Sequence, residues 1–244
     1  MWNFPRMLAH RGGGTLAPEN TLAALRCGHA HGFRAVEFDV MGLSDGSLVL
    51  MHDEELGRTV AGQGSVADCT LAQLSASDAG SWFSAEFAGE RVPSFAEAVD
   101  FCVRHQMQMN VEIKPVPGME ADTGRRTAEA CARLTAGSVL LSSFSVDALL
   151  AAQAKAPQVP RGLLVEAVPA DWRERLAELG AVALHAKASL MTAAQAAAVK
   201  AAGFGLMVYT VNDPARAREL FGIGVDAICT DRLDLIGPDF AAEA

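Results

Sequence analysis

Two carboxylates stand two positions apart in VEFDV, the stretch at 36–40, which otherwise has the composition of a short buried strand. Residues two apart in a strand project from the same face, about 6.6 Å from each other. Carboxylates held so close inside a protein repel each other unless a cation or a shared proton lies between them. Glu37 and Asp39 therefore indicate a site that holds a cation or a proton.

The same arrangement occurs again in NVEIK at 110–114, where Glu112 and Lys114 share a face. Glu37, Asp39 and Glu112 would then converge from neighbouring strands as hard oxygen donors without a soft ligand among them. Such a set suits Mg²⁺ or Ca²⁺. A salt bridge or a surface position is the better explanation for a lone carboxylate in a strand. Because unpaired buried charge is rare, three carboxylates at matching depth favour a divalent metal site.

A histidine ends the first strand-like segment, in the stretch HRGGG at 10–14. A lone histidine is usually structural or simply exposed. Here Arg11 and three glycines follow, and glycine permits a ligand to approach the backbone closely. Because imidazole changes its charge near neutral pH, we interpret His10 as a titratable group of the site.

The position of a second histidine follows from a turn. The dipeptide DG at 45–46 lies between apolar runs, which predicts a two-residue hairpin turn with Ser44 paired to Ser47. In that register Asp39 faces His52. Cross-strand partners project to the same side, so His52 is expected to return to the carboxylates.

Two cations accompany the acids, Arg11 and Lys114. Taken alone, each is explained equally well as a charge that neutralises a neighbouring carboxylate. Together with a divalent metal and two histidines, they suit an anionic oxygen ligand, namely a phosphoryl group. The metal and cations would bind the phosphate oxygens, and the imidazoles would transfer protons at neutral pH.

Eight strand-like runs alternate with Ala- and Leu-rich segments of helical period, which predicts an α/β fold. Eight strand–helix units in about 250 residues is the size of a single (β/α)8 TIM-type barrel. A doubly wound sheet would show the same alternation, but no dinucleotide-binding glycine fingerprint supports it. The strands are expected near 7–10, 35–40, 108–113, 138–142, 161–165, 181–185, 205–209 and 226–229. Helices are expected near 21–31, with Asn20 as the cap, and near 94–105, 122–135, 192–202 and 214–221.

One segment interrupts the alternation, at 53–93, where turn-forming residues accompany Trp82, Phe83 and Phe87. We interpret it as a small cap-like insertion after the second strand, so that residues 1–244 form one catalytic barrel domain. An elaborated surface loop with its own small core would give the same pattern.

Composition narrows the classes of partner. The chain of 244 residues has 20 Lys and Arg against 29 Asp and Glu, a formal charge of −9, and no basic run, which disfavours nucleic acid. Its five cysteines are widely spaced without a CxxC pattern, which is typical of a reducing compartment and predicts a cytoplasmic location. No stretch has the length of a membrane span or the pattern of a signal peptide.

These residues resemble a known family, the glycerophosphodiester phosphodiesterases, within the broader group of phospholipase-C-like barrel phosphodiesterases. The matching motifs extend over nearly the whole chain, and each is weak alone but specific in this order. They are AHRG at 9–12, PENT at 18–21, VEFDV at 36–40, SDGSLVLMHD at 44–53, DAGSWF at 78–83, ERVPSF at 90–95, NVEIKP at 110–115, SSF at 142–144, YTVN at 209–212 and CTDRLD at 229–234.

The resemblance implies a TIM-type barrel with an insertion after the second strand, a divalent metal, and hydrolysis of glycerophosphodiesters to glycerol phosphate and an alcohol. By position it implies that His10 and His52 are the acid–base pair, that Glu37, Asp39 and Glu112 bind the metal, that Arg11 and Lys114 bind the phosphate, and that Glu19 supports the site from outside it. The sequence departs from the family pattern at three places that bear on the alcohol pocket, namely the dipeptides Leu43-Ser44 and Glu54-Glu55 and the single residue Tyr209.

Two other enzyme classes remain open at this point. A relative acting on lysophospholipids or other lipid phosphodiesters would share the catalytic set and expose an apolar rim, which Trp82, Phe83 and Phe87 could supply. A metal-dependent barrel lyase or aldolase would use the same acids with a histidine as base, and a non-catalytic binding protein fits least. The sequence leaves open the preferred alcohol, Mg²⁺ or Ca²⁺, which histidine is the acid, direct water attack or a cyclic phosphate, and the oligomeric state.

Overall fold

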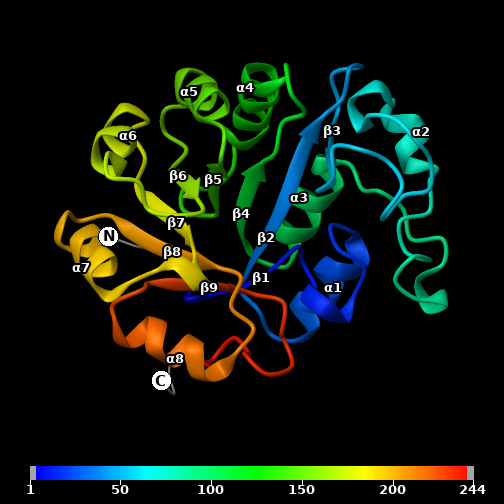
Figure 1. The fold of residues 1–244 in the computed structure, drawn as a ribbon. Coiled ribbons are helices and arrows are strands. Elements are labelled where there is room, and N and C mark those ends of the chain that lie inside the picture. Colours follow the sequence, from blue (N-terminus) through cyan, green and yellow to red (C-terminus); the bar gives the residue numbers. More distant parts are fainter. Residues whose placement is uncertain (1–3, 241–244) are drawn as a thin grey trace.

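The computed structural model describes residues 4–240, and in this range eight parallel strands close into a barrel surrounded by helices (Figure 1). The barrel order is β1, β2, β4, β5, β6, β7, β8, β9, and the pairing of β1 with β2 closes it. These strands are β1 (Met7–Ala9), β2 (Ala35–Gly42), β4 (Gln108–Ile113), β5 (Val139–Ser143), β6 (Arg161–Val165), β7 (Ala183–Lys187), β8 (Gly205–Tyr209) and β9 (Ala227–Thr230). The expected (β/α)8 barrel is confirmed.

The helices occupy the crossovers between successive strands, on the outside of the barrel (Figure 1). They are α1 (Leu22–Ala30), α3 (Phe95–Arg104), α4 (Glu120–Cys131), α5 (Val146–Lys155), α6 (Trp172–Glu178), α7 (Ala193–Ala201) and α8 (Pro214–Gly222). Several begin at the residues that sequence would choose, as α3 does at Ser94, where a capping box with Glu97 satisfies the first backbone donors. No helix in the described range is long and apolar enough to cross a membrane.

The alternation of side chains along β2 separates the chemistry from the packing. Val36, Phe38 and Val40 face outward and pack with the buried side of α3. The residues between them, Glu37 and Asp39, therefore face into the barrel, where both remain almost completely buried. The strand can carry two acids on its inner face because the apolar side chains of its outer face supply the packing against the surrounding helices.

The start of α1 differs from the expectation. Thr21, not Asn20, is the cap, because its hydroxyl accepts a hydrogen bond from the amide of Ala24. Asn20 has a left-handed backbone, with φ of 56°, and its amide turns inward. There its Nδ2 donates to Asp39 Oδ2 at 2.8 Å, and its Oδ1 accepts from the Asp39 amide at 3.1 Å. The predicted cap is thus a residue that holds a carboxylate in place.

The hairpin after β2 is present, but its register is shifted by one residue from the prediction. The third strand in sequence, β3 (Leu48–Leu50), runs antiparallel to β2 with Val40 opposite Leu50, and Asp39 accepts from the amide of Met51 rather than facing His52. The physical reason lies in the turn. Its loop has three residues instead of two, because Leu43 bonds Ser47 across it and Gly46 takes the left-handed conformation, with φ of 92°.

The segment at 53–93 packs beside the β2–β3 hairpin, at the right of Figure 1. It contains α2 (Leu71–Ser75) and two short 3-10 turns, at Val66–Asp68 and Ala85–Phe87. Its apolar residues form a small core with the hairpin, made of Met41, Leu43, Val49, Met51, Val60, Val66, Leu74, Ala79 and Val92.

The aromatic residues of this segment pack on one another. Trp82 meets Phe83 edge-on at 5.7 Å between ring centroids, and Phe83 meets Phe87 in the same way at 5.5 Å. Trp82 nevertheless remains 41% exposed, and its indole nitrogen donates to the carbonyl of Ala79. These three aromatic rings, here called the aromatic ladder, therefore pack mainly on one another, and Trp82 is the member that exposes a large face to solvent.

Close packing of α4 on α5 gives a stability prediction. Alanine normally stabilises a helix interior by about 0.5–1 kcal/mol relative to glycine. At Gly124 a Cβ atom would lie 2.2 Å from the carbonyl oxygen of Ala148. We therefore expect Gly124→Ala to lower the free energy of unfolding by about 1–3 kcal/mol, measured by urea denaturation. Gly222→Ala, in α8 with nothing within 4 Å, is the control and should be neutral or stabilising. Equal effects of the two changes would contradict this account of the helix contact.

Candidate active site

Three carboxylates meet inside the barrel, toward the ends of two adjacent strands. Asp39 on β2 pairs in register with Glu112 on β4, and Glu37 lies one face-position earlier on β2. Ligand oxygens of Glu37, Asp39 and Glu112 all lie within 4.8 Å of one another. The structure thus brings together the three acids that the sequence selects as metal ligands.

The electrostatics of this cluster favour a cation. Burial, with the charge of Asp39, raises the pKa of Glu37 to about 7. Burial, with the charges of Asp39 and Glu37, also raises the pKa of Glu112 well above its ordinary range. Acids in this condition bind a proton readily, or a hard cation in its place. Three oxygen donors without sulfur among them fit Mg²⁺ or Ca²⁺.

His10 follows β1 and lies at the edge of the acid cluster. Its Nδ1 is 2.5 Å from Asp231 Oδ1, just after β9, and its Nε2 is 3.8 Å from Glu37 Oε2. Burial alone would lower the pKa of His10, but the Asp231 hydrogen bond and the charges of Glu37 and Asp231 raise it above its ordinary value. One ring nitrogen is therefore fixed by Asp231, and the other faces the site.

His52 reaches the same centre although the predicted register is wrong. Its Nδ1 lies 2.7 Å from Asp53 Oδ1. Burial lowers the pKa of His52, and the charges of Asp39, Arg11 and Lys114 all act on it. His52 thus lies near those three residues, just beyond β3. Both histidines share one design, in which a carboxylate holds Nδ1 and leaves Nε2 available.

The two cations lie near different oxygens of Asp39, with Arg11 just after β1 and Lys114 just after β4. Arg11 Nε lies 3.7 Å from Asp39 Oδ2, and Lys114 Nζ lies 3.8 Å from Asp39 Oδ1 and 3.9 Å from Glu112 Oε1. These separations are longer than hydrogen bonds. Among residues 4–240, the buried Nε of Arg11 finds no hydrogen-bond partner. Nitrogen donors that lie near the carboxylates without hydrogen-bonding to them can bind the oxygens of a phosphoryl group.

Glu19 lies behind Arg11. It accepts from Arg11 Nη1 at 2.7 Å and from both terminal nitrogens of Arg58, at 2.8 and 2.7 Å. Burial would raise the pKa of Glu19, but Arg58 and Arg11 hold it below its ordinary value. Arg58 also donates through Nε to Asp53 Oδ2, which orients the partner of His52. A single arginine of the insertion therefore connects the supports of Arg11 and His52.

A cavity of about 360 Å³ opens beside the cluster. Glu112, Lys114 and Phe144 are among the residues that line it, together with Glu54 of the segment at 53–93. The ring of Phe144 is 47% exposed and meets Tyr209 edge-on at 6.0 Å between centroids. Cavities that combine apolar side chains with a few charged groups are typical of small-molecule sites.

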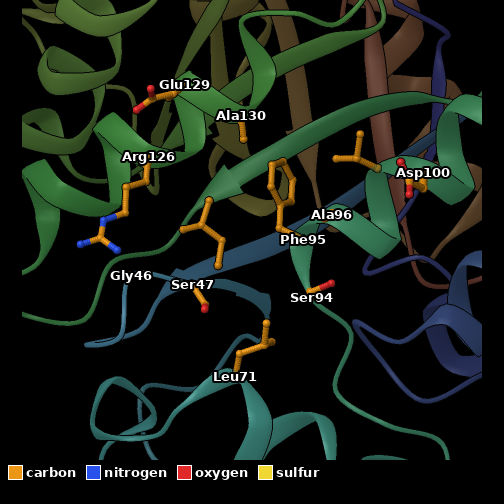
Figure 2. Close-up of a pocket in the computed structure, with 12 residues that line it drawn as sticks. Gly46, Ser47, Leu71, Ser94, Phe95, Ala96, Asp100, Arg126, Glu129 and Ala130 are labelled. Carbon is orange, nitrogen blue, oxygen red and sulfur yellow. The ribbon is translucent and has the colours of Figure 1, made fainter.

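A different cavity, of about 520 Å³, lies on the outer wall of the barrel (Figure 2). Its lining comes from α3, α4, the hairpin and α2, with Phe95 and Arg126 among the side chains. No residue of the site lines it. The outer cavity is therefore separate from the centre that holds the titratable groups.

Comparison with known proteins identifies the chain. Residues 10–235 match the Glycerophosphoryl diester phosphodiesterase family. The chain belongs to this family. The match includes His10, both acid-bearing strands and Asp231 at the end of β9. The expected family and enzyme class, a hydrolase acting on phosphoric diesters, are thereby confirmed.

Relatives of known name agree over nearly full length. The chain is 32% identical to a glycerophosphodiester phosphodiesterase of Caldanaerobacter subterraneus subsp. tengcongensis, over 92% of this chain and 93% of the relative. A phosphodiesterase structure from Oleispira antarctica, solved with the product sn-glycerol-3-phosphate, is 36% identical, has a TM-score of 0.92, and covers 99% of this chain and 98% of that one. The glycerophosphodiester phosphodiesterase structure of Agrobacterium tumefaciens is 28% identical, with a TM-score of 0.79 and coverage of 99% and 100%.

Four residues that support the site received no role in it from the sequence, although Asn20 was predicted to be a helix cap. Asp231 orients His10, Asp53 orients His52, Asn20 holds Asp39, and Arg58 connects Asp53 to Glu19. Three of them stand in motifs quoted above, namely PENT, the HD that follows the hairpin, and CTDRLD. Position within a motif was thus a usable signal for Asn20, Asp53 and Asp231, whereas Arg58 lies between motifs and carried none.

Asp231 should act as a positioning residue for His10. Its Oδ2 accepts from Asn212 Nδ2, so an amide at 231 would place one donor against another. We expect Asp231→Asn to lower kcat by at least about tenfold, and by no more than the 10² to 10⁴ that acid–base catalysis contributes. Because Asp231 raises the pKa of His10, the limb of the pH–rate profile that belongs to His10 should move to lower pH. Asp234→Asn, an exposed pair with Arg232, is the control. A slower enzyme with an unshifted profile would contradict the pairing.

Proposed function

We propose that this chain hydrolyses glycerophosphodiesters to glycerol 3-phosphate and an alcohol at the carboxylate cluster. The observation that carries the proposal is the convergence of Glu37, Asp39 and Glu112 between two histidines, each held by a carboxylate on Nδ1. Membership in the phosphodiesterase family and the product complex of the Oleispira antarctica relative support the same reaction.

Glu37, Asp39 and Glu112 would hold a divalent cation, Mg²⁺ or Ca²⁺. When bound, such a cation supplies positive charge that stabilises the phosphoryl oxygens in the transition state. Arg11 and Lys114 would bind the same oxygens from the two sides of Asp39. Asn20 keeps Asp39 in its rotamer by accepting from its amide and donating to its carboxylate.

His10 and His52 would transfer the protons. One removes the proton of the attacking hydroxyl, and the other gives a proton to the oxygen of the departing alcohol. Asp231 and Asp53 keep Nδ1 of each ring protonated, which leaves Nε2 as the reacting atom. The attacking hydroxyl is either water or a hydroxyl of the substrate's own glycerol, and the second route gives a cyclic phosphate first.

The proposal also gives roles to the segment at 53–93 and to the cavity of about 360 Å³ beside the carboxylate cluster. Residues 1–244 would act as one catalytic domain, of which 1–3 and 241–244 lie outside the described residues, and 53–93 would cap the site. The cavity beside Lys114 would receive the alcohol or the glycerol, with Phe144 as its apolar wall. Glu19 would fix Arg11 in place.

A cytoplasmic location is part of the same proposal. All five cysteines are free, and Cys102, Cys131 and Cys229 are buried as small core residues. An environment that keeps thiols reduced suits this usage. Fractionation of the native cells, with activity in the cytosolic fraction, would test it.

The reaction is tested by release of glycerol 3-phosphate from glycerophosphocholine and glycerophosphoethanolamine. We expect activity to fall below detection with a chelator and to return when Mg²⁺ or Ca²⁺ is restored, since three clustered carboxylates, two of them buried, need a cation. The cation that restores the higher kcat would be the one used. Full activity in excess chelator would refute the metal assignment, and no release with either cation would refute the substrate.

A lipid phosphodiester is the second candidate, because Trp82 and Phe144 are 41% and 47% exposed. Lysophosphatidylcholine compared with glycerophosphocholine would decide between the two. A kcat/KM higher for the lysophospholipid, and lost in Trp82→Ala, would favour the lipid substrate. The free glycerophosphodiester is preferred here, since most of the aromatic ladder is consumed by packing within the insertion.

A further inference from the structure

A second group of metal-binding atoms lies next to the carboxylate cluster. Ligand atoms of His10, Glu37 and Cys229 are within 4.8 Å of one another. Cys229 is on β9, where it pairs with Leu8 of β1, and its side chain packs with the residues that fill the barrel interior. The thiol therefore lies inside the barrel beside the catalytic centre, although the mechanism proposed above gives it no part.

The donors of this group differ in kind from those of the acid cluster. Imidazole nitrogen, thiolate sulfur and carboxylate oxygen are the ligands that Zn²⁺ prefers, whereas Mg²⁺ and Ca²⁺ take oxygen. Zinc lies about 2.0–2.3 Å from such donors, which requires donors about 3.3–3.8 Å apart. His10 Nε2 and Glu37 Oε2 are already 3.8 Å apart. A side-chain movement of about 1 Å at Cys229 would complete a three-ligand site with one position left for water.

The hydrogen bond of His10 gives independent support. A histidine that binds zinc almost always donates its other ring N–H to a carboxylate or carbonyl, which fixes the tautomer and turns the free nitrogen toward the metal. Asp231 holds His10 Nδ1 in this way, and Nε2 faces Glu37. The side chain of His10 is 19% exposed, so an ion from solvent meets this ring before it meets the buried thiol.

We propose that Zn²⁺ binds to His10, Glu37 and Cys229 and reversibly inhibits the enzyme. This inference rests on the proposed function for its inhibitory consequence, because Glu37 and His10 are shared. A zinc ion on Glu37 removes a ligand from the Mg²⁺ or Ca²⁺ site, and a zinc ion on His10 removes the lone pair needed for proton transfer. On binding, the Cys229 sulfur bonds to zinc and its proton passes to solvent, with no change in oxidation state.

Binding is tested first without any measurement of turnover. Co²⁺, a spectroscopic substitute for Zn²⁺, gives a thiolate-to-metal absorption band in the near ultraviolet when a cysteine is a ligand. We expect this band in the wild-type protein, its loss on addition of Zn²⁺, and its absence in Cys229→Ala. Cys102→Ala, another buried thiol but on α3, is the matched control and should keep the band. A band that survives in Cys229→Ala would overturn the site.

Inhibition is tested second, at a fixed concentration of Mg²⁺ or Ca²⁺. Micromolar Zn²⁺ should inhibit the wild type, and a chelator followed by fresh Mg²⁺ or Ca²⁺ should restore it. In Cys229→Ala the zinc concentration for half-inhibition should rise by at least about 10- to 100-fold, the range found for residues that merely orient ligands. Cys229→Ser, which keeps the volume, guards against a folding defect. Equal zinc sensitivity of wild type and both variants would overturn the proposal.

The two tests separate this inference from the proposed function. Uninhibited release of glycerol 3-phosphate with zinc present would contradict the zinc site and leave the reaction intact. A cobalt–thiolate band in a protein without phosphodiesterase activity would support the site and refute the reaction.

Discussion

Replacing His10 or His52 by alanine is expected to lower kcat by about 10² to 10⁴, the usual contribution of a general acid or base. Each ring has a carboxylate on Nδ1. His10 Nε2 lies 3.8 Å from Glu37 Oε2, and His52 lies near enough to Asp39, Arg11 and Lys114 for their charges to act on it. The loss should fall mainly on kcat, because neither ring binds the phosphate by charge alone. Measurement is initial-rate release of glycerol 3-phosphate at saturating metal.

A substrate with a good leaving group identifies which histidine is the acid. The p-nitrophenyl ester of glycerol 3-phosphate releases its alcohol without a proton, so the variant that lacks the acid should recover most of its rate on this substrate. His31→Ala, an exposed histidine at the end of α1, is the control for general effects. Near-normal turnover in both His10→Ala and His52→Ala, with folding intact, would refute the assignment.

Glu112→Gln should weaken metal binding and strengthen the fold at the same time. The glutamate is a proposed ligand, and its loss should raise the concentration of Mg²⁺ or Ca²⁺ needed for half-maximal activity by at least about tenfold. When no cation is bound, the negative charge of Glu112 destabilises the folded state. Burial and the charges of Asp39 and Glu37 oppose this charge, which is why they raise the pKa of Glu112. In chelator, the variant should be more stable than wild type by about 1–3 kcal/mol.

The pH dependence of this effect has a defined sign. Folded Glu37 keeps its proton to about pH 7, whereas the unfolded chain releases it near 4.5, its ordinary value. Between these limits the folded state binds more protons, so without metal the free energy of unfolding falls as pH rises. Glu112→Gln removes part of the repulsion and should flatten this slope. Metal at 100 times its Kd should restore about 2.7 kcal/mol to the wild type.

Urea denaturation in chelator at several pH values between about 5 and 8 measures both effects. Asp122→Asn, a half-exposed acid that pairs with Arg125 and Arg126 on α4, is the control and should leave the slope unchanged. A Glu112→Gln protein that is less stable than wild type in chelator would show that Glu112 is compensated by its neighbours rather than repelled by them.

The barrel could be predicted from sequence because its signals are periodic. Each strand is a short apolar run, and the outward residues of β2 alternate with its two acids, so both the strand and the direction of its side chains were readable. The hairpin register was not, because it depends on a difference of one residue in the turn. The dipeptide at 45–46 fits a two-residue loop, and only the cross-turn bond of Leu43 with Ser47 shows that the loop has three.

The site could be predicted in its ionisable groups but not in their supports. Glu37, Asp39 and Glu112 share strand faces, so spacing alone selects them. Asp231 lies 221 positions from His10 in the sequence, and no local sequence pattern around either residue predicts their contact. Asn20 illustrates a conflict of rules: its type and position suit a helix cap, but its left-handed backbone turns the amide to Asp39 and leaves capping to Thr21.

Arg58 limits how the segment at 53–93 could be exchanged between related enzymes. Its guanidinium bonds Glu19, which holds Arg11, and Asp53, which holds His52. A graft that carried a new segment for 53–93 without this arginine would release two supports at once, and a gain in substrate range would be masked by lost turnover. We therefore expect an exchange of this segment to keep the reaction rate only if Glu19, Asp53 and Arg58 are transferred together.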